Sequence, residues 1–165
     1  MKRRLKLGIS SCLLGKKVRY DASHRLDSYI KNRIGKSVQL VAVCPEVECG
    51  LSVPREEMHL VGTPESARLV TRFSRIDHTD RLLKWSRKKL KELEKEKLQG
   101  FVFKSNSPSC GLKGVKIYNK ESVFVKKGSG IFAKEFVKYF RFMPVIEDTQ
   151  LHSYKKRKRF MEKVL

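Results

Sequence analysis

Short apolar runs alternate along this chain with longer segments whose apolar residues recur at helical spacing. The short runs, bounded by glycine, serine or proline, are typical of strands. They cover residues 4–10, 38–43, 101–104, 115–118 and 143–146. The helical spacing covers residues 23–34, capped by Ser23 or Asp21, then 77–99 up to Gly100, 131–140, and a C-terminal segment from Asp148 or Thr149.

This order of elements predicts an α/β fold. The strands at 4–10 and 38–43 enclose a helix and form a βαβ unit, so they should pair in parallel through a right-handed crossover. Further alternation predicts a three-layer sandwich with a mainly parallel central sheet, Rossmann-like or flavodoxin-like, in one domain over residues 1–165. Residues 44–75 contain repeated proline and glycine and are predicted to be mostly loop. A loop of that length in a compact domain is usually functional.

Three cysteines stand just after three of the predicted strands. Cys12 follows the first strand, Cys44 ends the second, and Cys110 lies in the serine- and proline-rich loop 104–111. In open α/β sheets, ligands bind outside the carboxyl ends of the strands. We therefore expect these cysteines to meet at one mouth although they are far apart in sequence.

Three converging thiolates suit a soft metal or an iron–sulfur cluster. A structural zinc normally takes four ligands, often in closely spaced pairs, and the chain has no Cys-x-x-Cys. Three ligands leave one coordination position open, which favours chemistry over scaffolding. Three unrelated core cysteines remain the plainer alternative, and a disulfide oxidoreductase is disfavoured without the paired motif.

Polar residues near the cysteines complete the candidate site. Glu46 follows Cys44 closely and is a candidate general acid or base, or else a carboxylate paired with a basic residue. Ser107 and Ser109 either shape the loop or bind substrate. Asp21 and Arg55 are candidates for the polar lining, with local ion pairing as the alternative. The four histidines show no metal spacing and are expected at the surface.

The charge is strongly unbalanced, with 38 basic and 17 acidic residues and a formal net charge of +21. This excess favours anionic partners, RNA first among them, with a solvated lysine surface as the alternative. No apolar run approaches the ~20 residues that span a membrane, so no membrane partner is expected. The basic start Met1–Arg4 suggests an export signal, but Lys6 interrupts the apolar stretch after it, so a cytoplasmic location with reduced thiols is expected.

The motifs resemble those of the thiouracil desulfidase family. The resemblance rests on Ser10–Gly15 with Val18–Asp21, on Cys44–Val47, on Gly50-Leu51 with Pro54-Arg55, on Lys104–Gly111, on Gly128–Ala133 and on Pro144–Asp148. It implies that Cys12, Cys44 and Cys110 hold a [4Fe–4S] cluster whose fourth iron binds a thiocarbonyl sulfur, and that water replaces this sulfur without net redox change. It also implies proton transfer by Glu46 and substrate contact by Ser107.

Two positions depart from the family pattern. Cys49 stands where glycine is usual, and we expect a bystander thiol; a fourth cluster ligand would close the open iron. Ala22 follows Asp21 where glycine is common, which alters only the loop.

The substrate is left open among three hypotheses. Related longer proteins with an added C-terminal domain are associated with thiolated tRNA, whereas this chain ends at Leu165. The hypotheses are a desulfidase for a small thiolated nucleobase or nucleotide, a desulfidase or binding module for thiolated RNA that uses the basic run 155–159, and a non-catalytic metal or iron–sulfur protein.

Overall fold

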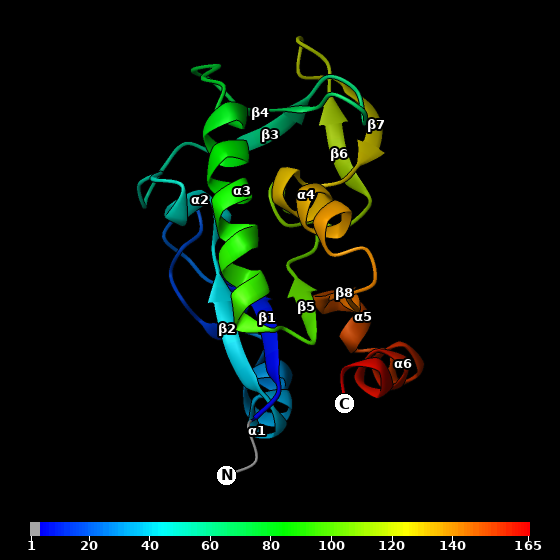
Figure 1. Cartoon of the computed structure of the whole chain (residues 1–165). Coiled ribbons are helices and arrows are strands. Elements are labelled where there is room, and N and C mark those ends of the chain that lie inside the picture. Colours follow the sequence, from blue (N-terminus) through cyan, green and yellow to red (C-terminus); the bar gives the residue numbers. More distant parts are fainter. Residues whose placement is uncertain (1–3) are drawn as a thin grey trace.

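The structure, a computed structural model, describes residues 4–165, so the start Met1–Arg3 of the supposed export signal lies outside the described residues. Figure 1 labels the elements in chain order. The strands are β1 (Lys6–Ser10), β2 (Gln39–Val43), β3 (Met58–Val61), β4 (Arg68–Thr71), β5 (Gly100–Phe103), β6 (Val115–Tyr118), β7 (Phe124–Gly128) and β8 (Val145–Glu147). The helices are η1 (Ser11–Leu14), η2 (Ile30–Ile34), α1 (Gly35–Ser37), α2 (Pro45–Glu48), α3 (Thr79–Glu96), α4 (Ile131–Tyr139), α5 (Asp148–Leu151) and α6 (Tyr154–Val164).

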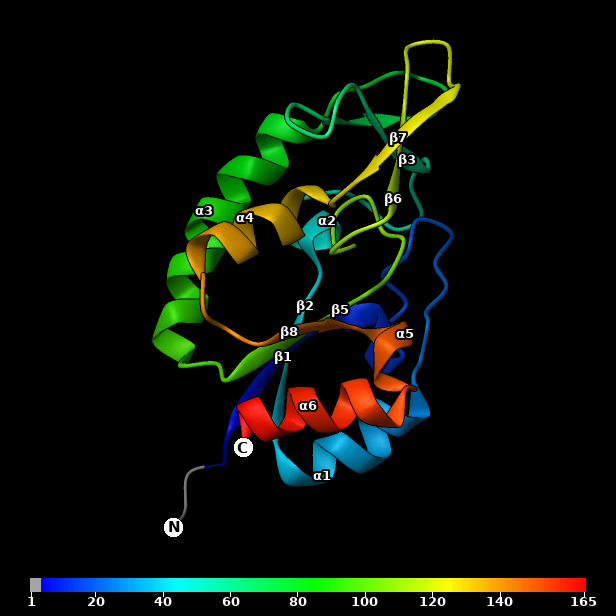
Figure 2. The same ribbon diagram turned by 90° about the vertical axis from the view of Figure 1, so that its right-hand side faces the viewer.

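The main sheet has the strand order β2-β1-β5-β8, and all of its pairings are parallel. Helices α3 and α4 cover one face, and η2, α1 and α6 cover the other (Figure 2). The α/β class and the mainly parallel central sheet are confirmed. Phe132 and Phe136 of α4 are fully buried and pack against Phe101 of β5 in the core.

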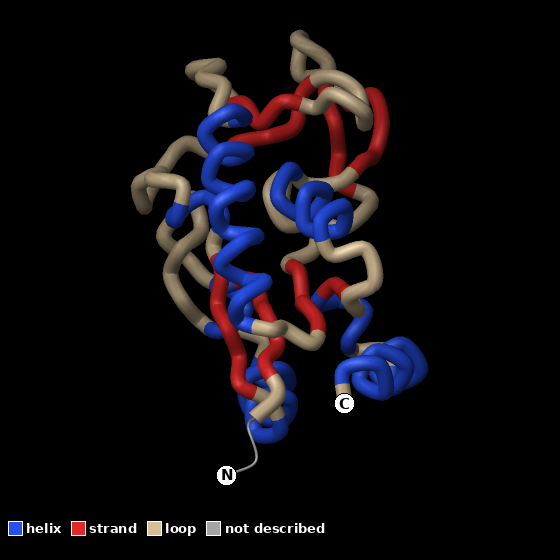
Figure 3. Tube along the Cα trace, viewed as in Figure 1, coloured by secondary structure: helices blue, strands red, loops and turns tan. Residues whose placement is uncertain are grey.

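A second sheet, with the order β4-β3-β6-β7, packs over one end of α3 and α4 (Figures 1 and 3). Residues 44–75 are mostly loop, as predicted, but this segment also contains α2, β3 and β4, which were not predicted. These four-residue elements are too short for a clear periodic pattern. β4 pairs with β3, and β3 pairs with β6, which lies far along the chain. The strand expected at 115–118 is confirmed, but it lies in this second sheet.

The helix expected from residue 23 begins later than predicted. Arg25 and Asp27 donate their backbone N–H groups to the carbonyls of Cys12 and Leu13, which holds this part of the segment against η1. The Asp27 side chain accepts a hydrogen bond from the N–H of Ile30 at 3.1 Å, so Asp27 takes the capping role assigned to Ser23 or Asp21. Helical structure then continues through Gly35 to Ser37.

Two other helix ends also differ from prediction. Lys97, not Gly100, ends α3, because Lys97 adopts a left-handed conformation with φ of 56° and Gly100 already begins β5. The C-terminal helix is broken at His152 and Ser153 into α5 and α6. The Ser153 hydroxyl accepts a hydrogen bond from the N–H of Lys156 and starts the second helix.

None of the helices within residues 4–165 has the length and apolar character that a membrane crossing requires.

Gly8 permits close packing between the two central strands. It lies opposite Phe101 in the β1–β5 register, and a Cβ atom at Gly8 would stand 2.2 Å from Cδ2 of the fully buried Phe101 ring. We expect Gly8→Ala to lower the free energy of unfolding by about 1–3 kcal/mol, because the ring must move within a packed core. Urea denaturation followed by circular dichroism measures this, with the exposed Ser37→Ala as control. Equal stability of the two variants would contradict it.

Candidate active site

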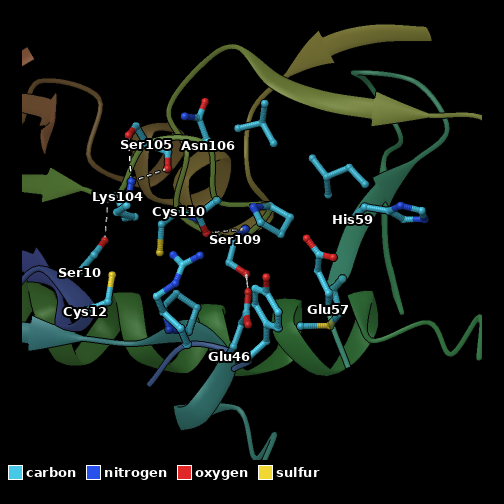
Figure 4. A pocket seen from close by; sticks show the side chains of 18 of the residues that line it. Ser10, Cys12, Glu46, Glu57, His59, Lys104, Ser105, Asn106, Ser109 and Cys110 are labelled. Carbon is cyan, nitrogen blue, oxygen red and sulfur yellow. Dashed lines mark hydrogen bonds between the residues drawn. The ribbon is translucent and has the colours of Figure 1, made fainter. Parts of the chain in front are cut away.

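Three cysteines from three adjacent strands line one cavity of about 630 Å³. Cys12 lies in η1 directly after β1, Cys44 precedes α2 after β2, and Cys110 lies in the turn after β5. Because β2, β1 and β5 are parallel neighbours, their carboxyl ends meet at one edge of the sheet. The Cys12 and Cys110 sulfurs point into the same space (Figure 4). The structure thus brings the three cysteines together.

The thiols of the cavity are free and resist ionisation. Burial raises the pKa of Cys12, raises that of Cys44 to about 11, and raises that of Cys110 well above its usual value. Each ionised neighbour adds to this effect, since charge on Cys12 also raises the pKa of the Cys44 and Cys110 thiols. Three thiolates in this cavity therefore require a bound group that carries positive charge.

Three free thiols from separate segments are available to hold that group. Within residues 4–165, no three His, Cys, Asp or Glu side chains stand close enough together to hold a single metal ion. A multinuclear iron–sulfur cluster holds each of its thiolates at a separate iron atom. The three soft sulfur donors also match that group in chemistry.

Glu46 is fixed at the cavity wall by two partners. Nε of Arg55 donates to Oε2 of Glu46 at 2.9 Å, and Nη2 of Arg55 donates to the same oxygen. The Ser109 hydroxyl donates to Oε1 at 2.7 Å (Figure 4). Both members of the ion pair are largely buried. The carboxylate therefore has one orientation, which a proton-transferring group needs.

Arg55 itself joins separate segments around this carboxylate. Its guanidinium donates to the backbone carbonyls of Val18 at 2.9 Å and Ser52 at 3.1 Å as well as to Glu46. The ion pairing considered for Arg55 and Glu46 is thus present, and it lies inside the cavity lining rather than at the free surface.

The loop that carries Cys110 is shaped by Ser107 and by α4. The Ser107 hydroxyl accepts hydrogen bonds from the N–H groups of Ser109 at 3.2 Å and Cys110 at 3.0 Å. The first turn of α4 donates to the Ser109 carbonyl, and a Cβ at Gly130 would stand 2.5 Å from the Ser109 backbone. Only glycine allows this approach. Ser107 therefore has the loop-shaping role, while its own hydroxyl proton is free to reach the cavity.

Two residues singled out in the sequence lie apart from this arrangement. Asp21 is exposed and absent from the cavity lining, and its carboxylate accepts hydrogen bonds from the hydroxyl and N–H of Ser23. Cys49 is also absent from the lining; its thiol donates to the Glu46 carbonyl at 3.2 Å and it packs with the core between α3 and the second sheet. This placement supports the expectation of a bystander thiol.

Positively charged side chains line much of the remaining wall, and sequence reasoning did not place them there. They are Arg19, Arg25, Arg72, Lys104, Lys116 and Lys127. Nε of Arg19 is buried without a hydrogen-bond partner among the described residues. Glu46 and Glu57 are the acidic residues of this lining. The cavity therefore favours an anionic occupant.

His59 of β3 was expected at the surface, and this prediction is wrong. Its side chain lines the cavity, is buried, and stacks on Tyr118 with ring centroids 5.1 Å apart. Burial, together with Arg75 and Arg72, lowers the pKa of His59. The alternation of residues 58–61 was the available signal, but it is too short to stand out within a supposed loop.

Comparison with known proteins agrees with this geometry. The family model for 2-thiouracil desulfurase matches residues 7–148. The uncharacterised protein YbbK of Bacillus subtilis (strain 168) is 34% identical over 109 residues, which cover 62% of this chain and 71% of that protein. A solved structure described as a [4Fe–4S]-dependent thiouracil desulfidase, TudS, superposes with a TM-score of 0.73 at 28% identity, covering 94% of this chain and 99% of that one.

The raised thiol pKa values predict slow alkylation of the metal-free protein. With a pKa of about 11, Cys44 has about one thiol in a thousand ionised at pH 8, and the thiolate is the reactive form. We expect the rate at which Cys44 reacts with iodoacetamide to rise about tenfold per pH unit between pH 8 and 10. In the urea-unfolded chain, the rate should stop rising soon above pH ~8.5, the ordinary pKa of a cysteine. Mass spectrometry of the cysteine peptides measures this. A plateau for folded Cys44 below pH 9.5 would contradict it.

Proposed function

Because this chain belongs to the 2-thiouracil desulfurase family, we propose that the cysteine cavity is its active site. The enzyme is a [4Fe–4S]-dependent desulfidase that replaces the sulfur of thiouracil with oxygen. The observation that carries the assignment of residues is the convergence of three free thiols and one oriented carboxylate in a single cavity.

The overall reaction balances without any oxidant or reductant. The carbon–sulfur double bond is broken, a carbon–oxygen double bond forms with the oxygen of water, and both protons of that water leave with the sulfur as hydrogen sulfide. Protons must therefore move from the oxygen to the departing sulfur, and the protein must supply a group that carries them.

Cys12, Cys44 and Cys110 would hold the cluster, leaving one iron without a protein ligand. When bound, the cluster supplies a soft Lewis acid that prefers sulfur over oxygen and polarises the carbon–sulfur bond. Burial opposes ionisation of the free thiols, and the positive charge of the iron atoms would stabilise the thiolates.

Glu46 would take a proton from the attacking water and return it to the departing sulfur. Arg55 and Ser109 keep its two oxygens in place for this transfer. Ser107 has both acceptor positions engaged by backbone N–H groups, so its hydroxyl can donate only its own proton, and a substrate carbonyl or ring nitrogen is a suitable acceptor. Asp21 lies outside the lining, and for it we propose no contact with a small substrate.

The charge of the cavity favours a phosphorylated substrate over a free base. Arg19, Arg25 and Lys104 stand at the lining near Cys12 and the serine loop, and a free base would use none of this charge. Thiolated RNA is the second candidate, supported by the +21 net charge. Four free cysteines also suit the reducing cytoplasm, where we place the protein.

Anaerobic reconstitution with iron and sulfide tests the cluster ligands. We expect a brown protein with the broad absorbance of an iron–sulfur cluster, and loss of that absorbance in Cys12→Ser, Cys44→Ser and Cys110→Ser. Cys49→Ser is the matched control and should keep its cluster and its activity. A colourless wild-type protein, or equal loss in the Cys49 variant, would refute the assignment.

The same reconstituted protein decides the substrate class. Sulfide release is measured with 2-thiouracil, 4-thiouridine monophosphate and thiolated tRNA, and we expect the nucleotide to be preferred over the base because of the positively charged lining. A cluster-loaded protein that releases no sulfide from any of the three would instead be a non-catalytic iron–sulfur protein.

Glu46→Gln tests the proton-transfer role. We expect kcat for sulfide release to fall by about 10²–10⁴-fold while the cluster absorbance is retained, because an amide cannot accept the proton. The exposed Glu65→Gln serves as the charge-matched control with normal turnover. An unchanged kcat in Glu46→Gln would show that another group moves the protons.

A further inference from the structure

A groove between α6 and the η2–α1 helix lies on the outer face of the molecule, separate from the cysteine cavity. Its volume is about 320 Å³, and Tyr29, Arg33, Tyr154, Arg157 and Lys158 contribute most of its polar and aromatic lining. Figure 2 shows α6 and α1 running side by side below the main sheet. We call this surface the α6 groove.

The α6 groove is strongly basic. Arg33, Arg157 and Lys158 line it, and lysine or arginine occupies nine positions on its helices, namely 31, 33, 36, 155–159 and 163. The acidic residue on these helices is Glu162. Within residues 4–165, none of the nine cations pairs with a carboxylate, so their charge is uncompensated by the protein.

Aromatic rings stand among these cations. The Arg157 guanidinium lies over the rings of Tyr29 and Tyr154, 4.8 and 5.7 Å from their centroids, and donates to the Leu151 carbonyl at 2.7 Å. This holds Arg157 in place while Tyr154 stays 69% exposed. A fixed, exposed ring bordered by cations is the arrangement on which bases of single-stranded nucleic acid stack.

The groove is connected to the rim of the cavity. Arg25 lines the cavity and Tyr29 lines the groove, and between them Asp27 bonds to His152 at 2.8 Å, just before α6. On the other side, the N–H of Ser105 in the cysteine loop donates to Asp148 of α5 at 2.7 Å. A strand lying in the groove would therefore have one end near the cavity.

A membrane surface fits these features less well. The apolar face of α6 is buried in the core through Phe160 and Val164, so this helix has no free apolar face to insert between lipids.

We propose that the α6 groove binds single-stranded RNA, with phosphates on the lysine and arginine side chains and a base stacked on Tyr154. The preference for RNA over DNA rests on the proposed function, because uracil is a base of RNA.

The binding test uses the full-length protein and a fluorescein-labelled uridine oligonucleotide of about ten nucleotides. Fluorescence anisotropy is recorded over a series of salt concentrations. The test variant carries Lys155→Gln, Lys158→Gln and Arg159→Gln, whose side chains are exposed and unpaired in the described chain. The matched control carries Lys84→Gln, Lys88→Gln and Lys91→Gln on the exposed face of α3.

We expect the α6 variant to bind at least about tenfold more weakly and to have a salt slope less steep by about 2, because three phosphate contacts are lost. The control should bind like the wild type. Tyr154→Ala should lose about tenfold in affinity with an unchanged salt slope, and Tyr154→Phe, which keeps the ring, should bind normally.

Several results would overturn the proposal. These are equal losses in the α6 and α3 variants, insensitivity to Tyr154→Ala, equal affinity for an oligothymidine DNA, or equal binding to vesicles of anionic lipid. Wild-type protein that releases sulfide from 2-thiouracil but binds no oligonucleotide overturns this inference alone. Protein that binds through the groove without releasing sulfide supports the groove and overturns the proposed function instead.

Discussion

The parallel pairing of β2, β1 and β5 is the constraint on which the rest of this site depends. Parallel neighbours end at the same edge of a sheet, so three cysteines dozens of residues apart are delivered to one cavity. The pairing itself requires close contact between strands, which Gly8 allows by leaving room for the Phe101 ring. The buried phenylalanines of α4 and β5 then hold the sheet and the cysteine loop in a fixed relation.

Burial gives the cysteines and the carboxylate different chemical roles within this frame. Burial raises the pKa values of the thiols and so opposes their ionisation. They are therefore suited to bind a cationic group, which compensates the charge of the thiolates. Glu46 is instead compensated by the protein, through Arg55 and Ser109. The proposed cluster ligands and the proposed proton-transferring carboxylate thus face one cavity, and the serine loop contributes Cys110 as a ligand and Ser109 as a partner of Glu46.

The excess positive charge gathers in two regions and is not spread evenly over the surface. One group of basic residues lines the cysteine cavity. These residues lie on loops near η1 and on the second sheet. Another part gathers along α6 and η2, around two tyrosines. The two regions are connected by the segment 25–29, in which Asp27 bonds to His152 just before α6.

The sequence by itself was enough for the α/β class, the parallel central strands and the positions of the three cysteines, because strand exits and periodic helices are local patterns. The motifs around Cys12, Cys44 and Cys110 were equally local, and they indicated the family and its chemistry. Cys49, for which a bystander role was expected, lies outside the cavity lining.

Only the tertiary structure decided what depends on contacts between distant segments. The strands β3 and β7 are held by pairing with β6, and β4 by pairing with β3, and no local pattern in such short segments predicts these pairings. His59 became a buried cavity residue for the same reason. The start of the first helix at Asp27 and the ion pair of Arg55 with Glu46 likewise follow from hydrogen bonds to chain segments that periodicity cannot bring together.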